Sequence, residues 1–152
     1  MHCLGSKTLA HGLIGILLFA GAAFASSHRA MNGTWVLVPA QSDFAGQPAV
    51  VNGTLTISER EGHIYISRTF DYNGGMGTVS YSSSMDGNVN STIREGKEFK
   101  TKAKWVRDAL DVTTVAGGLT TVEHFYLNAN GLLTLTVERP DRPVMRLVFH
   151  RQ

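Results

Sequence analysis

The side chains that could do chemistry in this sequence are scattered along it. Beyond residue 25 no two histidines stand at i, i+2 or i, i+4, the spacings that place two metal ligands side by side, and no cysteine accompanies them; these histidines are His28, His63, His124 and His150. His124 adjoins Glu123, but neighbours on a strand point to opposite faces and do not easily share one site. The serines within residues 80–84 are not part of a Gly-x-Ser-x-Gly elbow. We therefore expect no enzyme, no metal and no other cofactor.

Arg68 and a set of aromatic residues are the candidates for binding a ligand. Arg68 shares one side of an extended segment with Ile64, Ile66 and Phe70, so alternation places it in the interior. A guanidinium left alone there is costly, which means that it has a partner or that the interior is wet. The aromatic side chains would form an apolar wall around a ligand or simply fill a core; they are Phe70, Tyr81, Trp105 and Tyr126.

Ten short extended segments must position these side chains. Most alternate between apolar and polar residues, and the turns between them contain Gly, Asn or Asp, which tolerate the positive φ of hairpin turns. No connection is long enough for a crossover helix, so consecutive strands should pair antiparallel. The predicted strands are residues 33–38, 51–58, 63–70, 76–83, 89–94, 98–106, 110–116, 120–127, 132–138 and 144–151.

A meander of this length would leave two exposed edges if it stayed open, and closure removes both. The sequence thus favours an all-β fold, an antiparallel up-and-down barrel of about eight to ten strands, over a sandwich. Residues 40–48 would form a short loop or helical turn that plugs one end, because Gly46 and Pro48 exclude a longer helix.

Charged residues predict which face of each strand points inward. Lys100, Lys102 and Lys104 share one side of segment 98–106 and must face water, so Phe99, Thr101, Ala103 and Trp105 face the interior. By the same rule Leu133, Leu135 and Val137 point inward. Segments 120–127 and 144–151 are apolar on both sides, which suggests that a neighbouring loop or a second chain covers them.

The first 25 residues have the layout of a secretory signal peptide. Lys7 precedes an apolar run at residues 12–24, and Ala23 and Ala25 form an Ala-x-Ala site. The run is shorter than the roughly 20 residues that span a bilayer, so we expect cleavage rather than stable membrane insertion. This predicts an exported, periplasmic or extracellular protein with a flexible segment 26–32 and a single barrel domain at 33–152.

Export and charge narrow the possible partners. The single cysteine, Cys3, lies within the signal peptide, so the mature domain must be held together by packing rather than by disulfides. The whole chain has a formal net charge of +2, and Lys7 leaves with the signal peptide. A net charge this close to zero creates no strong positive potential that would attract nucleic acid or an anionic membrane. We expect a monomer or weak homo-oligomer.

The stretch Gly33-Thr34-Trp35 on the first strand, together with the meander and a basic residue near the end of the last strand, resembles the calycin barrels, which include lipocalins and fatty-acid-binding proteins. More narrowly, GTWVLVPAQSDF and RLVFHRQ resemble small exported bacterial lipocalin-like domains. The resemblance implies that Gly33 and Trp35 close one end of the barrel and that an arginine, Arg146 or Arg151, packs on the tryptophan. We assign this role to Arg146.

The resemblance to fatty-acid-binding proteins is incomplete. Their last strand holds a carboxylate with an Arg-x-Tyr pair, but here Val148 stands two places after Arg146. Segment 40–48 is also too short to hold their two lid helices.

These observations lead to a first hypothesis and two alternatives. In the first, an exported lipocalin-like barrel binds a small, mainly hydrophobic molecule in its interior, with Arg68 as polar anchor. In the second, the interior is packed and the protein is a structural or protein-interaction module that acts through its outer surface. An enzyme built on the same fold is the least favoured.

Overall fold

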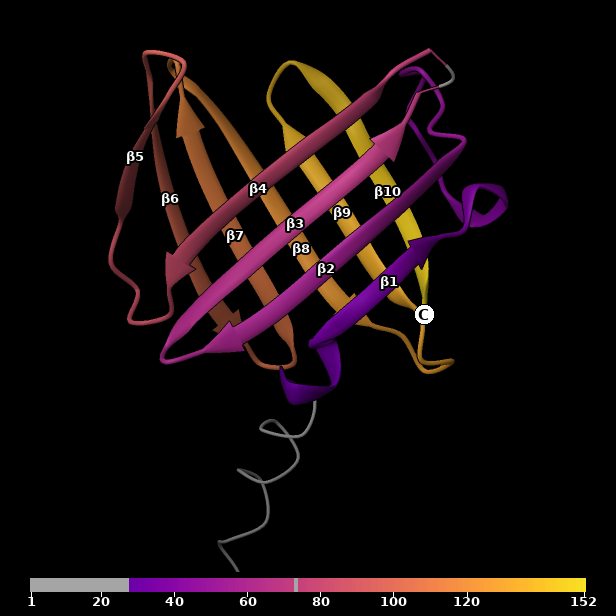
Figure 1. The fold of residues 1–152 in the computed structure, drawn as a ribbon, viewed down its shortest axis with the longest axis horizontal. Helices are drawn as coiled ribbons and strands as arrows, with labels where there is room; N and C mark the ends of the chain where they lie inside the picture. Colours follow the sequence, from indigo (N-terminus) through magenta and orange to yellow (C-terminus); the bar gives the residue numbers. More distant parts are fainter. Residues whose placement is uncertain (1–27, 73) are drawn as a thin grey trace, which may run out of the picture.

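The computed structural model describes residues 28–72 and 74–152, which form a ten-stranded antiparallel sheet that curls into a nearly closed barrel (Figure 1). Strand order in the sheet is β4-β3-β2-β1-β10-β9-β8-β7-β6-β5, an up-and-down meander. The strands are β1 (Gly33–Leu37), β2 (Asn52–Arg60), β3 (His63–Asp71), β4 (Met76–Ser84), β5 (Asn90–Arg94), β6 (Lys97–Val106), β7 (Ala109–Ala116), β8 (Leu119–Leu127), β9 (Leu133–Arg139) and β10 (Arg142–Arg151). The predicted fold class and all ten strands are confirmed, with boundaries shifted by at most a few residues.

Two-residue turns make the hairpins tight. In the turns after β2 and β5, Glu61 and Glu95 have φ of 52° and 50°, and the glycines that follow them have φ of 72° and 73°. Positive φ at both central residues matches the twist of the flanking strands, which is why glycine recurs at these places. The turns after β5, β7 and β9 lie together at one end of the barrel, which we call the upper end (Figure 1).

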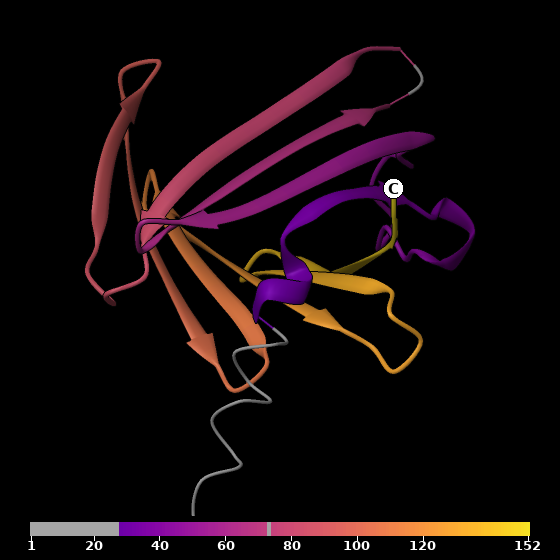
Figure 2. The same ribbon diagram turned by 60° about the horizontal axis from the view of Figure 1, so that its bottom comes forward.

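The barrel closes through its first and last strands. β1 pairs with β10 in the register Trp35↔Arg151 and Leu37↔Phe149, and with β2 on its other side. On the opposite side β4 and β5 do not pair with each other within the described residues. The side-chain amide of Asn90 donates to the hydroxyls of Ser83 at 3.0 Å and Ser84 at 3.2 Å, and the two strands diverge from there toward the upper end (Figure 2).

The lower end of the barrel is filled by an apolar core. The largest fully buried side chains include Trp35, Leu55, Ile57, Ile64, Leu110, Phe125 and Phe149. The predicted facing of β6 is confirmed, because Thr101 and Ala103 are buried while the three lysines are exposed. The predicted facing of Leu133, Leu135 and Val137 on β9 is confirmed as well.

The segment that follows β1 continues the backbone pairing along the edge of β10. After β1 the chain forms a 3-10 turn, η1 (Pro39–Gln41), and then runs along β10. Val148 accepts from the backbone N–H of Val38 at 2.7 Å and donates its own N–H to the Ser42 hydroxyl at 3.0 Å. Phe44 packs against the core from this segment. On the outer face of β10, Val148 is 3% exposed but Val144 is 52% exposed, so the question left open for this strand is answered only in part.

Residues 28–31 form a helical turn beneath the barrel, whereas we expected segment 26–32 to be flexible. Met31 is fully buried and its carbonyl accepts a hydrogen bond from the Trp35 indole N–H at 2.9 Å. The predicted signal peptide lies outside the described residues. In the described part of the chain, no helix has both the length and the apolar character to cross a bilayer.

Candidate ligand site

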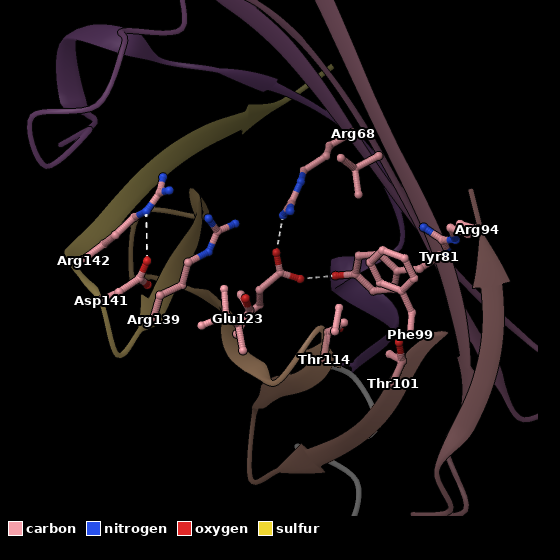
Figure 3. A pocket seen from close by; sticks show the side chains of 14 residues that line it. Arg68, Tyr81, Arg94, Phe99, Thr101, Thr114, Glu123, Arg139, Asp141 and Arg142 are labelled. Carbon is pink, nitrogen blue, oxygen red and sulfur yellow. Dashed lines mark hydrogen bonds and ion pairs between the residues drawn. The ribbon is translucent and has the colours of Figure 1, made fainter. Parts of the chain in front are cut away.

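A cavity of about 330 Å³ lies in the upper half of the barrel, and we call it the upper cavity. Its apolar wall consists of Val79, Phe99, Ala116 and Leu119, and three threonines join them: Thr101, Thr114 and Thr121. Tyr81 and six charged residues complete the lining, namely Arg68, Arg94, Glu123, Arg139, Asp141 and Arg142 (Figure 3). An apolar wall with a few convergent polar groups is typical of a small-molecule site.

Glu123 is the centre of a polar cluster in this cavity. One carboxylate oxygen, Oε1, accepts from Nη1 of Arg68, and the other, Oε2, accepts from the Tyr81 hydroxyl (Figure 3). The side chains of Arg68 and Glu123 are only 15% and 4% exposed. A buried carboxylate needs such donors, and a buried guanidinium needs such a counter-charge. Of the two alternatives left open for the interior Arg68, a partner or a wet interior, the structure shows the partner, Glu123.

Burial and charge shift the pKa values of two members of this cluster. Burial is the largest single influence on Arg68 and lowers its pKa, but the charge of Glu123, Tyr81 and the hydrogen bond to Glu123 together outweigh burial, so the pKa lies above its ordinary value. Burial raises the pKa of Tyr81 well above its ordinary value, and the negative charge of Glu123 raises it further. Arg68 therefore stays charged, and the Tyr81 hydroxyl keeps its proton as a hydrogen-bond donor.

Sequence reasoning missed Glu123. On β8 it shares a face with Phe125, which is fully buried, while His124 on the other face contacts Asp111 at 2.7 Å and Glu138 at 3.7 Å. The sequence did contain a signal that could have identified Glu123. An interior arginine requires an acidic partner on the inward face of a strand, and Glu123 stands two places from the aromatic residue Phe125.

A second cavity, of about 230 Å³, adjoins the upper cavity and shares Arg68, Val79 and Arg139 with it. Phe70 lines this second cavity and stacks on Phe149 with ring centroids 6.4 Å apart. Residues 47, 48 and 50 also line it. Arg68 thus stands between two spaces inside the barrel.

The structure brings only some of the predicted ligand-binding residues together. Arg68 and Tyr81 line the upper cavity, and Phe70 lines the second one. Trp105 faces inward but lies at the closed lower end, where its ring stacks on His28 at 3.8 Å. Tyr126 lies on the outer face of β8 and is 36% exposed, because Phe125 occupies the inward position. Trp105 and Tyr126 therefore line neither of these two cavities.

Barrel closure uses Arg151 rather than Arg146. The guanidinium carbon of Arg151 lies 4.4 Å from the centre of the Trp35 ring, and its nitrogens donate to the carbonyls of Asn32 and Ala30. Gly33 has φ of 139°, and a Cβ there would lie 2.6 Å from Nη1 of Arg151, so only glycine fits. Arg146 instead donates to the carbonyl of Gln41 at 3.2 Å on the outside.

The described residues offer little for metal or acid–base chemistry. Within residues 28–72 and 74–152 no group of three or more His, Cys, Asp or Glu side chains is arranged to hold a metal ion. Glu123 and His124 face opposite sides of β8, so they do not act on one substrate. What the interior can do is bind: it offers an apolar wall, three hydroxyls and several guanidinium groups.

Among comparisons with known proteins, only those with solved structures find similar proteins, and the similarity concerns the fold. No family model matches the sequence, and no curated protein matches it. Among solved structures, fatty-acid-binding protein 1 of Echinococcus granulosus superposes with a TM-score of 0.61 at 15% identity, over 81% of this chain and 98% of that one. Lipid binding protein 8 of Caenorhabditis elegans gives 0.62 at 13% identity, over 82% and 96%.

A third solved structure is a secretory abundant heat soluble protein of Ramazzottius varieornatus, which gives a TM-score of 0.63 at 10% identity over 81% of this chain and 96% of that one. At such low identities the likeness concerns the fold alone. The chain therefore has the fold of the calycin-type barrels, the group that contains the fatty-acid-binding and lipid-binding barrels.

Proposed function

We propose that the protein is an exported barrel that binds a small, mainly hydrophobic molecule in its interior. The observation that carries this proposal is the upper cavity, which combines an apolar wall with convergent hydroxyl and guanidinium groups. A core that filled the barrel would leave no such space, so the cavity also counts against the alternative of a packed interaction module. Export rests on the predicted signal peptide.

The likeness to binding barrels supports the same proposal. Two of the similar structures are named for binding fatty acids or lipids, and the superposition includes more than nine-tenths of each of those two chains. In this chain the connection from β1 to β2 carries only the 3-10 turn η1. Its ligand site must therefore be closed by strands and turns rather than by a pair of helices.

A neutral apolar dye tests the proposal directly. Nile red, whose fluorescence rises in apolar surroundings, should bind with a stoichiometry of about one per chain, as expected for one interior site of this size. The variant Ala116→Trp places an indole in the upper cavity and should lower the dye affinity at least about tenfold, because the cavity would be filled.

Val115→Trp is the matched control, since Val115 is the neighbouring residue on β7 and is 37% exposed on the outer face. It should leave dye binding unchanged. Absence of dye uptake by the folded wild-type protein, or equal loss in both variants, would contradict an interior site.

A further inference from the structure

The seam between β4 and β5 leaves two strand edges unused. In the part of the chain that the structure describes, the other eight strands are hydrogen-bonded to a neighbour on both sides, whereas β4 pairs only with β3 and β5 only with β6. The side-chain amide of Asn90 ties the lower end of the seam to Ser83 and Ser84, and the strands diverge from there (Figure 2). Two unpaired edges therefore face each other across a seam that widens toward the upper end.

The hydrogen bonds of the β3–β4 hairpin show which backbone groups of β4 are unused. In an antiparallel pair, only every second residue of a strand bonds to the partner strand. The N–H of Tyr72 donates to the carbonyl of Gly75 at 3.1 Å, and the N–H of Met85 donates to that of Gly62 at 2.8 Å, so the phase is fixed from both ends. The residues whose N–H and C=O groups point toward the seam are Met76, Thr78, Ser80 and Ser82.

No protective feature guards this edge of β4. Edge strands usually carry charged side chains, a proline or a bulge that prevents pairing with another chain. β4 reads MGTVSYSSS, without a charge or a proline, and its register with β3 runs from Met76 to Ser84 without a bulge. A row of alternating N–H and C=O groups is matched by the backbone of another extended chain.

The side chains beside the seam define what such a chain would carry. Val79 and Tyr81 line the upper cavity from β4, and Phe99 lines it from β6. Arg94, at the end of β5, lines this cavity and also a groove of about 430 Å³ formed by outward-facing residues of β2, β3 and β4. Figure 3 shows Arg94 beside Tyr81, and no ion pair to Arg94 is found among the described residues. The inward positions of an added strand would therefore meet apolar groups and one guanidinium without an acidic partner.

A second folded copy of the chain is badly placed to supply the strand. Its unused edges within the described residues are again β4 and β5, and each of them faces the other across its own seam. A single extended segment meets no such obstacle, because a strand occupies only about 4.8 Å in the direction of its hydrogen bonds.

We infer that the seam binds an extended acidic segment of another protein as an additional strand, antiparallel to β4. The apolar side chains of this segment turn toward the upper cavity, and an acidic side chain lies beside Arg94. This inference goes beyond the proposed function and does not rest on it, because it follows from the strand edges and from the charge at the seam.

A synthetic peptide tests the inference. The probe is a fluorescein-labelled ten-residue peptide in which valine and threonine alternate between two terminal glutamates, and fluorescence anisotropy measures its affinity. Amide hydrogen exchange, followed by NMR, locates the bound peptide. Saturating peptide should slow exchange at Thr78, Ser80 and Ser82 at least about tenfold. Val79 and Tyr81 should change much less, because their N–H groups already bond to β3.

Two variants at one position separate the backbone from the side chain. Ser80→Pro removes an N–H that faces the seam and leaves the bonds to β3 in place, a position at which proline is tolerated. Ser80→Val is the matched control, because both variants lose the hydroxyl that contacts Ser67 at 2.8 Å but only valine keeps the N–H. Peptide affinity should fall at least about tenfold in Ser80→Pro and stay within about twofold of wild type in Ser80→Val.

A second peptide tests the charge. Replacing both glutamates of the probe with lysines should weaken its binding to the wild-type protein, and Arg94→Gln should remove most of this difference. Added salt should reduce the difference as well, because the seam is open to solvent.

Several results would overturn the inference. These are the absence of peptide binding by the folded wild-type protein, unchanged exchange at Thr78, Ser80 and Ser82 in the complex, and equal affinities of Ser80→Pro and Ser80→Val. If Ser80→Pro does not fold, the exchange experiment decides alone. Equal binding of the lysine peptide would refute the acidic character of the partner. A dimer of the free protein in which the same three amides are already protected would assign the edge to a second copy. None of these measurements uses Nile red, so the proposed function is tested separately.

Discussion

Replacing Glu123 with glutamine should destabilise the barrel strongly although it changes few atoms. The substitution keeps the size of the side chain and removes the charge that faces Arg68, whose own side chain is only 15% exposed. Removing one partner of a buried ion pair leaves the other charge uncompensated, at a cost of about 3–5 kcal/mol. The Tyr81 hydroxyl can still donate to the amide oxygen, and Arg68 borders a cavity that water can enter. We therefore expect a loss near about 3 kcal/mol, the lower end of that range.

Such a loss is large compared with the stability of a domain, which is about 5–15 kcal/mol. Urea unfolding followed by tryptophan fluorescence measures it, since Trp35 is fully buried and Trp105 partly buried in the lower half of the barrel. The control is Glu138→Gln on the outer face, where the glutamate side chain is 52% exposed. That change should shift the free energy of unfolding by no more than about 0.5 kcal/mol.

A double variant separates the charge effect from packing. Arg68→Met with Glu123→Gln removes both charges and keeps an acceptor for Tyr81, so it should be more stable than Glu123→Gln alone by at least about 1 kcal/mol. If Glu123→Gln and Glu138→Gln cost the same, or if the double variant shows no recovery, then the reasoning about the buried pair is refuted.

Three further predictions concern the rest of the barrel. Trp35→Ala should cost about 3–5 kcal/mol in urea unfolding, because it leaves a large cavity and removes the ring on which Arg151 stacks; a loss below about 1 kcal/mol would contradict this. Gly33→Ala should cost about 1–3 kcal/mol, because φ of 139° strains any side chain and the added Cβ meets Arg151, while Gly46→Ala, with open space around it, lacks the clash. The Ser84 hydroxyl, followed by the amide groups of Asn88, lowers the pKa of Asp86 to about 2, so the stabilisation it gives is present above about pH 4 and is lost as the pH falls through about 2. An NMR titration of Ser84→Ala should show a higher Asp86 pKa, and an unchanged value would exclude the hydroxyl as the cause.

The strands and their faces could be predicted from the sequence because alternation and turn residues are local signals. The parity of Lys100, Lys102 and Lys104 identified the inner face of β6, and the same reasoning placed Arg68 inside with a need for a partner. The pairing of β1 with β10 followed from the need to remove two sheet edges.

Depth along the barrel axis could not be predicted in the same way. Parity correctly turned Trp105 inward, but only the register of the hairpins places it at the closed end beside His28 rather than at the cavity. On β8 both faces carry apolar residues, so alternation left the facing of this strand open; Glu123 and Phe125 take the inward positions and Tyr126 lies outside. The choice between Arg146 and Arg151 depended on how far β10 extends past β1, which is a property of the whole sheet.

The pairing of β1 with β10 also bears on how the chain folds. Eight of the nine strand pairings join neighbours in the sequence, while this one joins segments such as Asn32 and Arg151, which are 119 residues apart. Hairpins form in about 1–10 μs, whereas contacts between distant segments carry a larger loop-closure entropy and slow folding. Two ribbons of hairpins, β1–β4 and β5–β10, can therefore form early, and docking of Trp35 under Arg151 is the step that joins them into a barrel. Until that step the edges of β1 and β10 are open to pairing with another chain, so aggregation during refolding should depend on how quickly this one seam closes.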